Sequence, residues 1–490
     1  MSWDQFLATC EEDLRAGRTD RVVKRLQSLN TAKIPRSFAS PVASLCHRTE
    51  QISQGLRILG PIVLADRKLK QATPVEITEY SALLRRYGAV KEALKKLKTV
   101  DPAAVPQSLL YQAFCHFNLW QYEDAITCLE KYLKLPLAPY ALSVAKVNLL
   151  SALIVLKRSK EAFALADEEV RLNKEKGFTR LLANCLEMRA QIHADIGSLS
   201  EAREDLSQAA GILAQGNLPD SSFVKKWLAI LEARETKSVE PLVAFRQDAL
   251  VHRHWEGVRE ADLYILKIKF DAEAFDYLYC GTPHEGYRRR MAGEIGHECT
   301  RTELIVGSGK GYSIDLETGE VVGLEPLIAG GKFHRALSAL LKDFYRPPNI
   351  GALFSDIFPD EFFDIHSSPL RVHQIMRRVR RWSEAAKAPM EVSGHKGLYS
   401  LKLGGGVQVR IPVERPVAAW EEAHLARLER HFGNGRFNPR AVREALGLSL
   451  DQAKRLTKWG VENGILTRFG SGPATSYEIT GKEDMELKAA

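Results

Sequence analysis

A helical-hairpin pattern that recurs along the first half of the chain constrains the fold more than any other feature. From Ser2 to about Ala233, apolar residues return every three or four positions between short Gly, Pro, Asn or Asp breaks, which predicts successive amphipathic helices. Four hairpins align on an alanine in their second helix, spaced 32, 37 and 40 residues apart: Ala93, Ala125, Ala162 and Ala202. Small residues there let paired helices approach closely, and stacked hairpins bury a continuous core. Residues 1–237 are therefore predicted to form an α-solenoid.

The four hairpins, between Tyr80 and Leu213, resemble the tetratricopeptide repeat (TPR). That family repeats every 34 residues or so, and its concave face generally holds a peptide or a protein. The resemblance thus implies a protein or peptide partner, or another protomer in a possible homodimer. A generic array of helical hairpins is the alternative. Residues 238–296 continue the helical pattern and are interpreted as a helical cap or connector, where Arg288–Arg290 either touch phosphates or lie on a solvated helix end.

Beyond Gly296 the apolar pattern changes from a period of 3.6 to a period of 2, which predicts a domain boundary and then short strands, beginning with Thr302–Leu316. The turn Gly307–Gly311 superficially matches a phosphate-binding loop. Such a loop needs four residues between its glycines and a helix after it. A strand pattern follows instead, so nucleotide binding is not expected there.

The segment Leu370–Trp382 gives the strongest indication of a binding surface. As a helix, it has an apolar stripe on one face: Val372, Ile375, Met376, Val379 and Trp382. The predicted DNA-binding residues project elsewhere: His373, Gln374, Arg377, Arg378 and Arg381. In a major groove, Arg can pair with both guanine acceptors and Gln with adenine, while neighbouring Arg side chains neutralise phosphates.

A predicted β-hairpin follows this helix, with strands in Met390–Leu403 and Val407–Ile411. Its tip, Gly394–Gly397, would place His395 and Lys396 near a phosphate or a minor groove. The alternative is a basic solvated helix followed by an unrelated hairpin.

Residues 297–412 resemble the winged-helix effector domain of OmpR/PhoB-type response regulators. The resemblance depends on an N-terminal sheet, a supporting helix pair, the Val-His-x-Ile-x-Arg pattern of the next helix and a Gly-x-Tyr-x-Leu hairpin, here Gly397–Leu401. In that family the third helix enters the major groove and the hairpin contacts the minor groove, which implies such roles for Gln374, Arg377, Arg381 and His395. The Arg-Leu-Arg register of the family is shifted here and no receiver domain precedes it, so control by aspartyl phosphorylation is not expected.

Residues 417–482 are predicted to form a second winged helix after a short linker, Pro412–Pro416. Helices are expected at Ala418–His431, Asn438–Leu446 and Ser449–Asn463, then two strands within Ile465–Ile479. The pattern resembles MarR- or IclR-like winged helices, some of which bind proteins rather than DNA. Its predicted DNA-binding residues are Lys454, Arg455, Lys458 and Arg468.

Charge and motif content narrow the function classes. The net charge is +8, and Tyr287–Lys482 holds 29 Lys and Arg against 22 Asp and Glu, which either favours a polyanionic partner or is ordinary surface. No secretory signal or membrane span is recognised, and the seven cysteines are scattered without a CxxC pair, so a cytoplasmic protein without disulfides or zinc is expected. No catalytic motif is found, and His252 and His254 are interpreted as surface residues, so no enzyme activity, cofactor or metal is expected.

The sequence therefore predicts a mainly α protein, with an N-terminal TPR-like α-solenoid followed by two α+β winged-helix domains. The favoured function is a bacterial, sequence-specific transcription regulator that binds double-stranded DNA and receives a partner on its repeats. The alternative is a non-enzymatic adaptor in which the repeats and winged helices all bind proteins.

Overall fold

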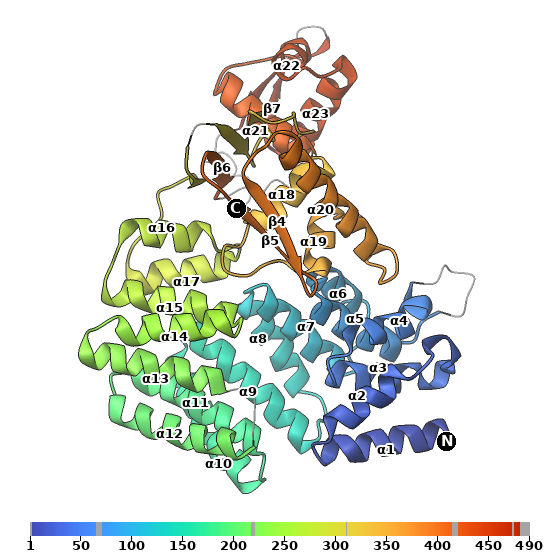
Figure 1. The fold of residues 1–490 in the computed structure, drawn as a ribbon, viewed down its shortest axis with the longest axis vertical. Helices are drawn as coiled ribbons and strands as arrows, with labels where there is room; N and C mark the ends of the chain where they lie inside the picture. Colours follow the sequence, from blue (N-terminus) through green and yellow to red (C-terminus); the bar gives the residue numbers. More distant parts are fainter. Residues whose placement is uncertain are drawn as a thin grey trace. The chain divides into compact units, whose positions relative to one another are not determined.

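A computed structural model describes residues 2–64, 71–216, 221–309, 311–413, 420–472 and 475–480. The chain is mainly helical and divides into two compact units, each described by itself (Figure 1). Unit 1 comprises Met1–Thr300, Asp343–Ser355 and Glu361–Leu370. Unit 2 comprises Arg301–Lys342, Asp356–Asp360 and Arg371–Ala490. No helix in the described ranges is long and apolar enough to cross a membrane.

Unit 1 is a stack of antiparallel helical hairpins, in which consecutive helices lie side by side (Figure 1). Its first helices are α1 (Trp3–Arg15), α2 (Thr19–Gln27), the 3₁₀ turn η1 (Thr31–Lys33), α3 (Arg36–Arg48), α4 (Ile52–Val63), α5 (Pro74–Tyr87), α6 (Val90–Leu97), α7 (Gln107–Asn118) and α8 (Tyr122–Leu133). The stack continues with α9 (Pro139–Val155), α10 (Ser159–Glu175), α11 (Thr179–Asp195), α12 (Leu199–Gly216), α13 (Ser221–Thr236), α14 (Glu240–Val251), α15 (Trp255–Ile268), α16 (Ala272–Cys280) and α17 (Glu285–Ile295).

The anchor alanines explain why these helices pair. Ala93, Ala125, Ala162 and Ala202 are all fully buried, and so are the residues four positions later: Leu97, Leu129, Ala166 and Leu206. Local signals set the helix ends, as in α5, which begins with a capping box between Thr73 and Glu76 and ends at Gly88 with a φ of 106°. The predicted helical-repeat solenoid is confirmed, and the helical pattern continues through residues 238–296 as expected.

Two segments that the sequence assigned to the domain 297–412 belong to unit 1. The backbone N–H of Phe363 donates to Glu92 Oε2 at 2.8 Å, and the Tyr80 hydroxyl donates to the carbonyl oxygen of Phe363 at 3.2 Å. Phe363 itself is fully buried. The grouping of residues thus differs from the four predicted domains because these contacts join positions far apart in the sequence.

Unit 2 begins with a small sheet in the order β1-β6-β2-β3. Strands were predicted after Gly296, but Val407–Ile411 was predicted as part of the following hairpin, whereas it lies in this sheet and the hairpin is formed within Met390–Leu403. Strand β6 pairs antiparallel with β1 and parallel with β2, so the chain returns to this sheet after the helices. The elements between residues 301 and 413 are β1 (Glu303–Gly307), β2 (Tyr312–Asp315), β3 (Val321–Val322), α18 (Lys332–Leu341), α19 (Ile350–Ile357), α20 (Ser368–Ala385), β4 (Met390–His395), β5 (Leu398–Leu403) and β6 (Val407–Pro412). Most of α19 and the first residues of α20 are grouped with unit 1. Strand β2, not a helix, follows the Gly307–Gly311 turn, whose residue 310 lies outside the described residues.

The C-terminal part of unit 2 has a helical core with a two-stranded sheet. It contains α21 (Trp420–Phe432), α22 (Pro439–Leu446), α23 (Leu450–Glu462), β7 (Leu466–Phe469) and β8 (Ser476–Ile479). Leu428, Val442 and Leu456 are fully buried in one hydrophobic cluster that holds the three helices together. Most of the predicted linker and the start of the first predicted helix fall in 414–419, outside the described residues.

Candidate nucleic-acid interface and inner-face cavity

Helix α20 separates an apolar face from a basic face, as its sequence predicted. The apolar stripe is buried: Val372, Ile375, Met376, Val379 and Trp382. Asp364 fixes the turn before the helix, because its Oδ1 accepts the N–H groups of His366 and Ser367 at 3.0 and 2.7 Å. The buried apolar stripe therefore packs α20 against the core, and the hydrogen bonds to Asp364 fix the turn from which the helix begins.

The exposed face of α20 presents Gln374, Arg377, Arg378 and Arg381. None of the three arginines forms an ion pair with an acidic side chain in the described part of the chain. Their guanidinium groups therefore keep their full donor capacity for an external acceptor such as phosphate or a guanine edge.

His373 has a different environment from the other predicted DNA-binding residues. It is half-buried, and its Nδ1 is hydrogen-bonded to the hydroxyl of Tyr399 on β5. Arg380 forms a second bond between the helix and the hairpin: its Nε donates to the carbonyl oxygen of Val392 on β4 at 2.8 Å. These two bonds join helix α20 to the β4–β5 hairpin, and the sequence did not indicate either.

The β4–β5 hairpin exposes its tip. His395 pairs with Leu398 across a two-residue turn, in which Lys396 has a φ of 48° and Gly397 a φ of 79°. Positive φ at both central residues is typical of the tight turns that match strand twist. His395 and Lys396 are both exposed there, in the positions predicted from the sequence.

The predicted DNA-binding residues of the second winged helix, which we call the second module (residues 417–482), also lie on its surface. A capping box between Ser449 and Gln452 starts α23, and Ala453, Leu456 and Gly460 are buried, so Lys454, Arg455 and Lys458 are exposed. Arg455 lies 3.9 Å from Glu421, and Lys458 lies 3.7 Å from Glu462. Lys454 and the exposed Arg468 form no ion pair with a described acidic residue.

An ion-pair cluster connects α21 to the sheet of unit 2, and the sequence did not indicate it. Arg430 pairs with both Asp315 and Glu317, and Arg410 Nη1 lies 2.8 Å from Asp315 Oδ2. Burial raises the pKa of Asp315, but the hydrogen bond and charge of Arg430 outweigh it, so that pKa lies below its usual value. The two modules of unit 2 are therefore held together in part by charge.

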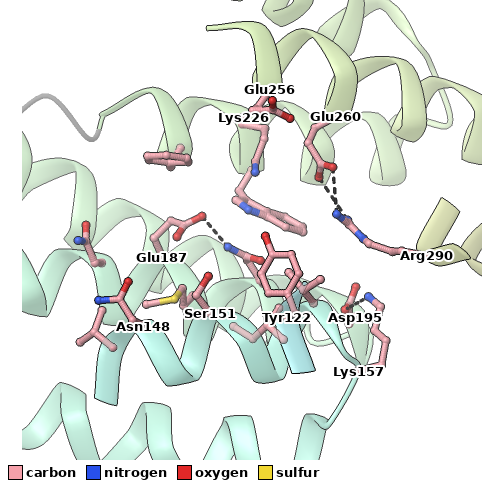
Figure 2. A pocket seen from close by; sticks show the side chains of 18 of the residues that line it. Tyr122, Asn148, Ser151, Lys157, Glu187, Asp195, Lys226, Glu256, Glu260 and Arg290 are labelled. Carbon is pink, nitrogen blue, oxygen red and sulfur yellow. Dashed lines mark hydrogen bonds and ion pairs between the residues drawn. The ribbon is translucent and has the colours of Figure 1, made fainter. Parts of the chain in front are cut away.

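A cavity of about 420 Å³ lies within the repeats of unit 1 (Figure 2). Most of the residues that line it come from every second helix: Asn148 and Ser151 on α9, Asn184 and Glu187 on α11, Lys226 and Trp227 on α13, and Glu256, Glu260 and Tyr264 on α15. Tyr122, at the start of α8, also lines it. Helices that alternate in this way form one face of a hairpin stack, which we call the inner face.

Much of the charge in this cavity is paired. Arg290 on α17 lies 3.0 Å from Glu260, and Lys157 lies 2.8 Å from Asp195 (Figure 2). Arg290 also lies 2.8 Å from Glu294, outside the cavity lining. Burial alone would lower the pKa of Arg290, but the charges of Glu260 and Glu294 raise it well above the usual value. Of the three consecutive arginines Arg288–Arg290, only Arg289 is exposed, whereas the other two are half-buried.

No group of His, Cys, Asp and Glu side chains suited to a metal ion is found within the described ranges. The rings of His252 and His254 lie 6.2 Å apart, and both residues are exposed, as predicted.

Comparisons with protein-family models and with curated proteins return no match. Solved structures similar to this chain include the apo form of RapI, at 13% identity and a TM-score of 0.38, covering 56% of this chain and 86% of that one. A Rap protein complexed with competence and sporulation factor has 15% identity and a TM-score of 0.40, covering 60% and 87%. Aspartyl phosphate phosphatase F from Bacillus subtilis has 13% identity and a TM-score of 0.37, covering 62% and 88%. The likeness concerns the helical fold alone.

Proposed function

We propose that this protein is a sequence-specific, non-enzymatic DNA-binding transcription regulator whose helical repeats receive a peptide or protein partner. The observation that carries the proposal is the exposed face of α20, where Arg377, Arg378 and Arg381 have no acidic partner among the described residues. A structural role would pair or bury these arginines, whereas a polyanion would supply the acceptors that they lack.

The proposed DNA contact places α20 in a major groove, as in winged helices of the OmpR/PhoB type. Gln374, Arg377 and Arg381 lie at spacings of three and four residues, so they follow one another along the same helix face. They would read base edges, while Arg378 and the hairpin tip at Lys396 would hold phosphates. His373 would act indirectly, because its bond to Tyr399 fixes the hairpin relative to the helix.

The repeats are the proposed receiver of a second ligand. The inner-face cavity offers aromatic surface together with amide groups from Asn148 and Asn184, which suits a polypeptide with both apolar side chains and main-chain hydrogen-bonding groups. Partner binding there would supply the signal to which the DNA-binding unit responds.

A purely protein-binding adaptor is the second candidate, and one observation favours it. Residues Asp343–Ser355 and Glu361–Leu370, which a free winged helix would keep in its own core, are part of unit 1. In this role unit 2 would be a further protein-binding module and α20 would contact an acidic protein surface.

Selection of bound duplexes from a randomised DNA library distinguishes the two candidates. The full chain should enrich a defined sequence, and Gln374→Ala or Arg377→Ala should relax the preference at one or two positions, because a bidentate base contact contributes about 1–3 kcal/mol. Arg171→Ala is the matched control, since Arg171 is also an exposed arginine on a helix. Failure of the full chain to enrich any sequence would favour the adaptor.

A further inference from the structure

The inner-face cavity has an excess of negative charge on its lining. The carboxylates of Glu187, Asp195, Glu256 and Glu260 face the cations of Lys157, Lys226 and Arg290. Arg290 and Lys157 are already engaged by Glu260, Asp195 and Glu294. The Lys226 ammonium lies 5.7 and 5.4 Å from the ring centroids of Phe223 and Trp227. Of the two remaining carboxylates, Glu187 Oε1 accepts a hydrogen bond from Gln191 Nε2 at 2.8 Å, and Glu256 pairs with an arginine outside the cavity lining.

That partner is Arg259, which Glu256 shares with a residue from a distant part of the chain. Arg259 is fully buried; its Nη1 donates to Glu256 Oε2 and its Nη2 donates to Asp343 Oδ1, both at 2.7 Å. The single guanidinium group of Arg259 therefore pairs with two carboxylates. Desolvation by the surrounding protein raises the pKa of Glu256, and the charge of Asp343 raises it further, whereas the charges of Arg259 and Arg346 lower it; the net pKa lies above its usual value. Glu256 thus shares its hydrogen-bonded cation with a second carboxylate, and its side chain is 47% exposed.

A second, independent feature of the cavity calls for a hydrogen-bond acceptor. Trp227 is 3% exposed, and its Nε1–H has no partner among the described residues. A buried donor without an acceptor costs about 1–3 kcal/mol. A peptide carbonyl group in the cavity would satisfy it, so the occupant should carry both a cation and an acceptor.

We propose that the cavity binds an arginine- or lysine-containing peptide through Glu256, and that this occupancy strengthens the ion pair between Arg259 and Asp343. The proposal rests on the proposed function, in which the repeats receive a peptide. A ligand cation beside Glu256 partly neutralises that carboxylate, which weakens the electrostatic attraction between Glu256 and Arg259. The guanidinium group of Arg259 is then held more strongly by Asp343. Because coupling between two sites is reciprocal, an anchored Asp343 also favours the cation at Glu256.

The backbone around Asp343 is a suitable place to measure the effect of this pairing. Asp343 follows α18 by two residues, and the next residues hold the chain to unit 1: the N–H of Phe344 donates to the carbonyl oxygen of Gly281 at 3.0 Å, and the Tyr345 hydroxyl donates to Asp262 at 2.9 Å. Tighter pairing of Asp343 should therefore slow the opening of this segment.

Hydrogen exchange of the full chain, followed by mass spectrometry on peptides covering Leu341–Arg346, tests the proposal. The probe is Nα-acetyl-arginine methylamide at millimolar concentration, with the citrulline analogue as the neutral isostere and the glutamate analogue as the opposite charge. We expect the arginine probe to slow exchange of this segment several-fold and the citrulline probe to leave it unchanged. Equal effects of both probes, no effect of arginine, or a larger effect of the glutamate probe would overturn the proposal.

Two variants localise the effect. Glu256→Gln should abolish the response, whereas Glu161→Gln should retain it, because Glu161 has the same i,i+3 pairing with an arginine but lies outside the cavity. Asp343→Asn should weaken binding of the arginine probe several-fold. A response that survives in Glu256→Gln would contradict the assigned acceptor. The comparison of probes in the unmutated chain requires no variant to fold, and its result is independent of whether α20 binds DNA.

Discussion

Arginine has different roles in the two units of this protein. In unit 1, Arg259 is fully buried, the side chain of Arg290 is only 13% exposed, and each arginine lies between two carboxylates. On α20, Arg377, Arg378 and Arg381 are exposed and form no ion pair with a described carboxylate. Removal of a buried partner leaves uncompensated charges inside the protein, whereas removal of an exposed arginine leaves none. The difference separates side chains that hold the fold from side chains available to a ligand.

The first prediction tests the structural side of this comparison. Arg259→Met should lower the free energy of unfolding of unit 1 by about 3–5 kcal/mol, because Glu256 and Asp343 lose their shared counter-charge. Urea unfolding of the full chain followed by far-ultraviolet circular dichroism measures it. Arg171→Met is the control: Arg171 pairs with Glu175 on an exposed helix face, so a change of about 0.5 kcal/mol or less is expected. Similar losses in both variants would remove the distinction between buried and exposed arginines in unit 1.

The second prediction uses acid to weaken the same pairs. Burial raises the pKa of Glu294, but Arg290, Lys157 and Lys267 outweigh it and lower that pKa from 4.5 to about 2. A carboxylate with a lowered pKa in the folded state stabilises the fold fully above its unfolded value and loses the contribution as pH falls toward the folded value. Unit 1 should thus lose stability between about pH 4.5 and 2. Urea midpoints across this range should fall less steeply in Glu294→Gln; identical profiles would contradict the assignment.

The third prediction extends the comparison to the second module. If unpaired cations mark ligand contacts, Lys454→Ala with Arg468→Ala should lower the slope of log K against log salt for DNA binding by about two, since each phosphate contact contributes about 0.9. Arg455→Ala with Lys458→Ala should change it less, because Glu421 and Glu462 lie beside them. An unchanged slope in the first pair would assign this module to a protein partner.

The smallest expected effect concerns the bond between helix and hairpin. Tyr399→Phe removes the hydroxyl that contacts His373 and should cost about 1 kcal/mol, since one neutral hydrogen bond is lost. DNA affinity should fall by up to about tenfold while the salt slope stays constant, because no phosphate contact is removed. A fall in the slope would mean that Tyr399 or His373 touches a phosphate directly.

Features that depend on neighbouring residues or on the periodicity of a helix or strand could be predicted from the sequence. The anchor alanines, the buried stripe of α20 and the exposed hairpin tip at Lys396 all depend on contacts between near neighbours or on helical and strand periodicity. Gln374, Arg377 and Arg381 were assigned to the exposed face for the same reason, and the structure places them there. Their role in binding DNA stays a prediction.

Features that depend on distant pairs could not be predicted. Arg259 and Asp343 are 84 positions apart, and nothing in either neighbourhood indicates the other. The same applies to Phe363, whose contacts to Tyr80 and Glu92 place a predicted winged-helix loop in unit 1. His373 was predicted as a DNA contact from its helix position, but its partner Tyr399 lies 26 positions later. An amphipathic pattern shows which face of a helix is buried, but it does not show which distant residues pack against that face.

The salt dependence of duplex binding by the full chain tests the central claim most directly. A labelled duplex titrated with protein at several salt concentrations, followed by fluorescence anisotropy, gives the affinity and its slope. We predict steep salt dependence for the unmutated chain, and for Arg377→Ala with Arg381→Ala a large loss of affinity, a slope lowered by about two and unchanged unfolding. No binding by the unmutated chain at low salt, or full affinity in the double variant, would contradict the assignment of α20 as a DNA-binding helix.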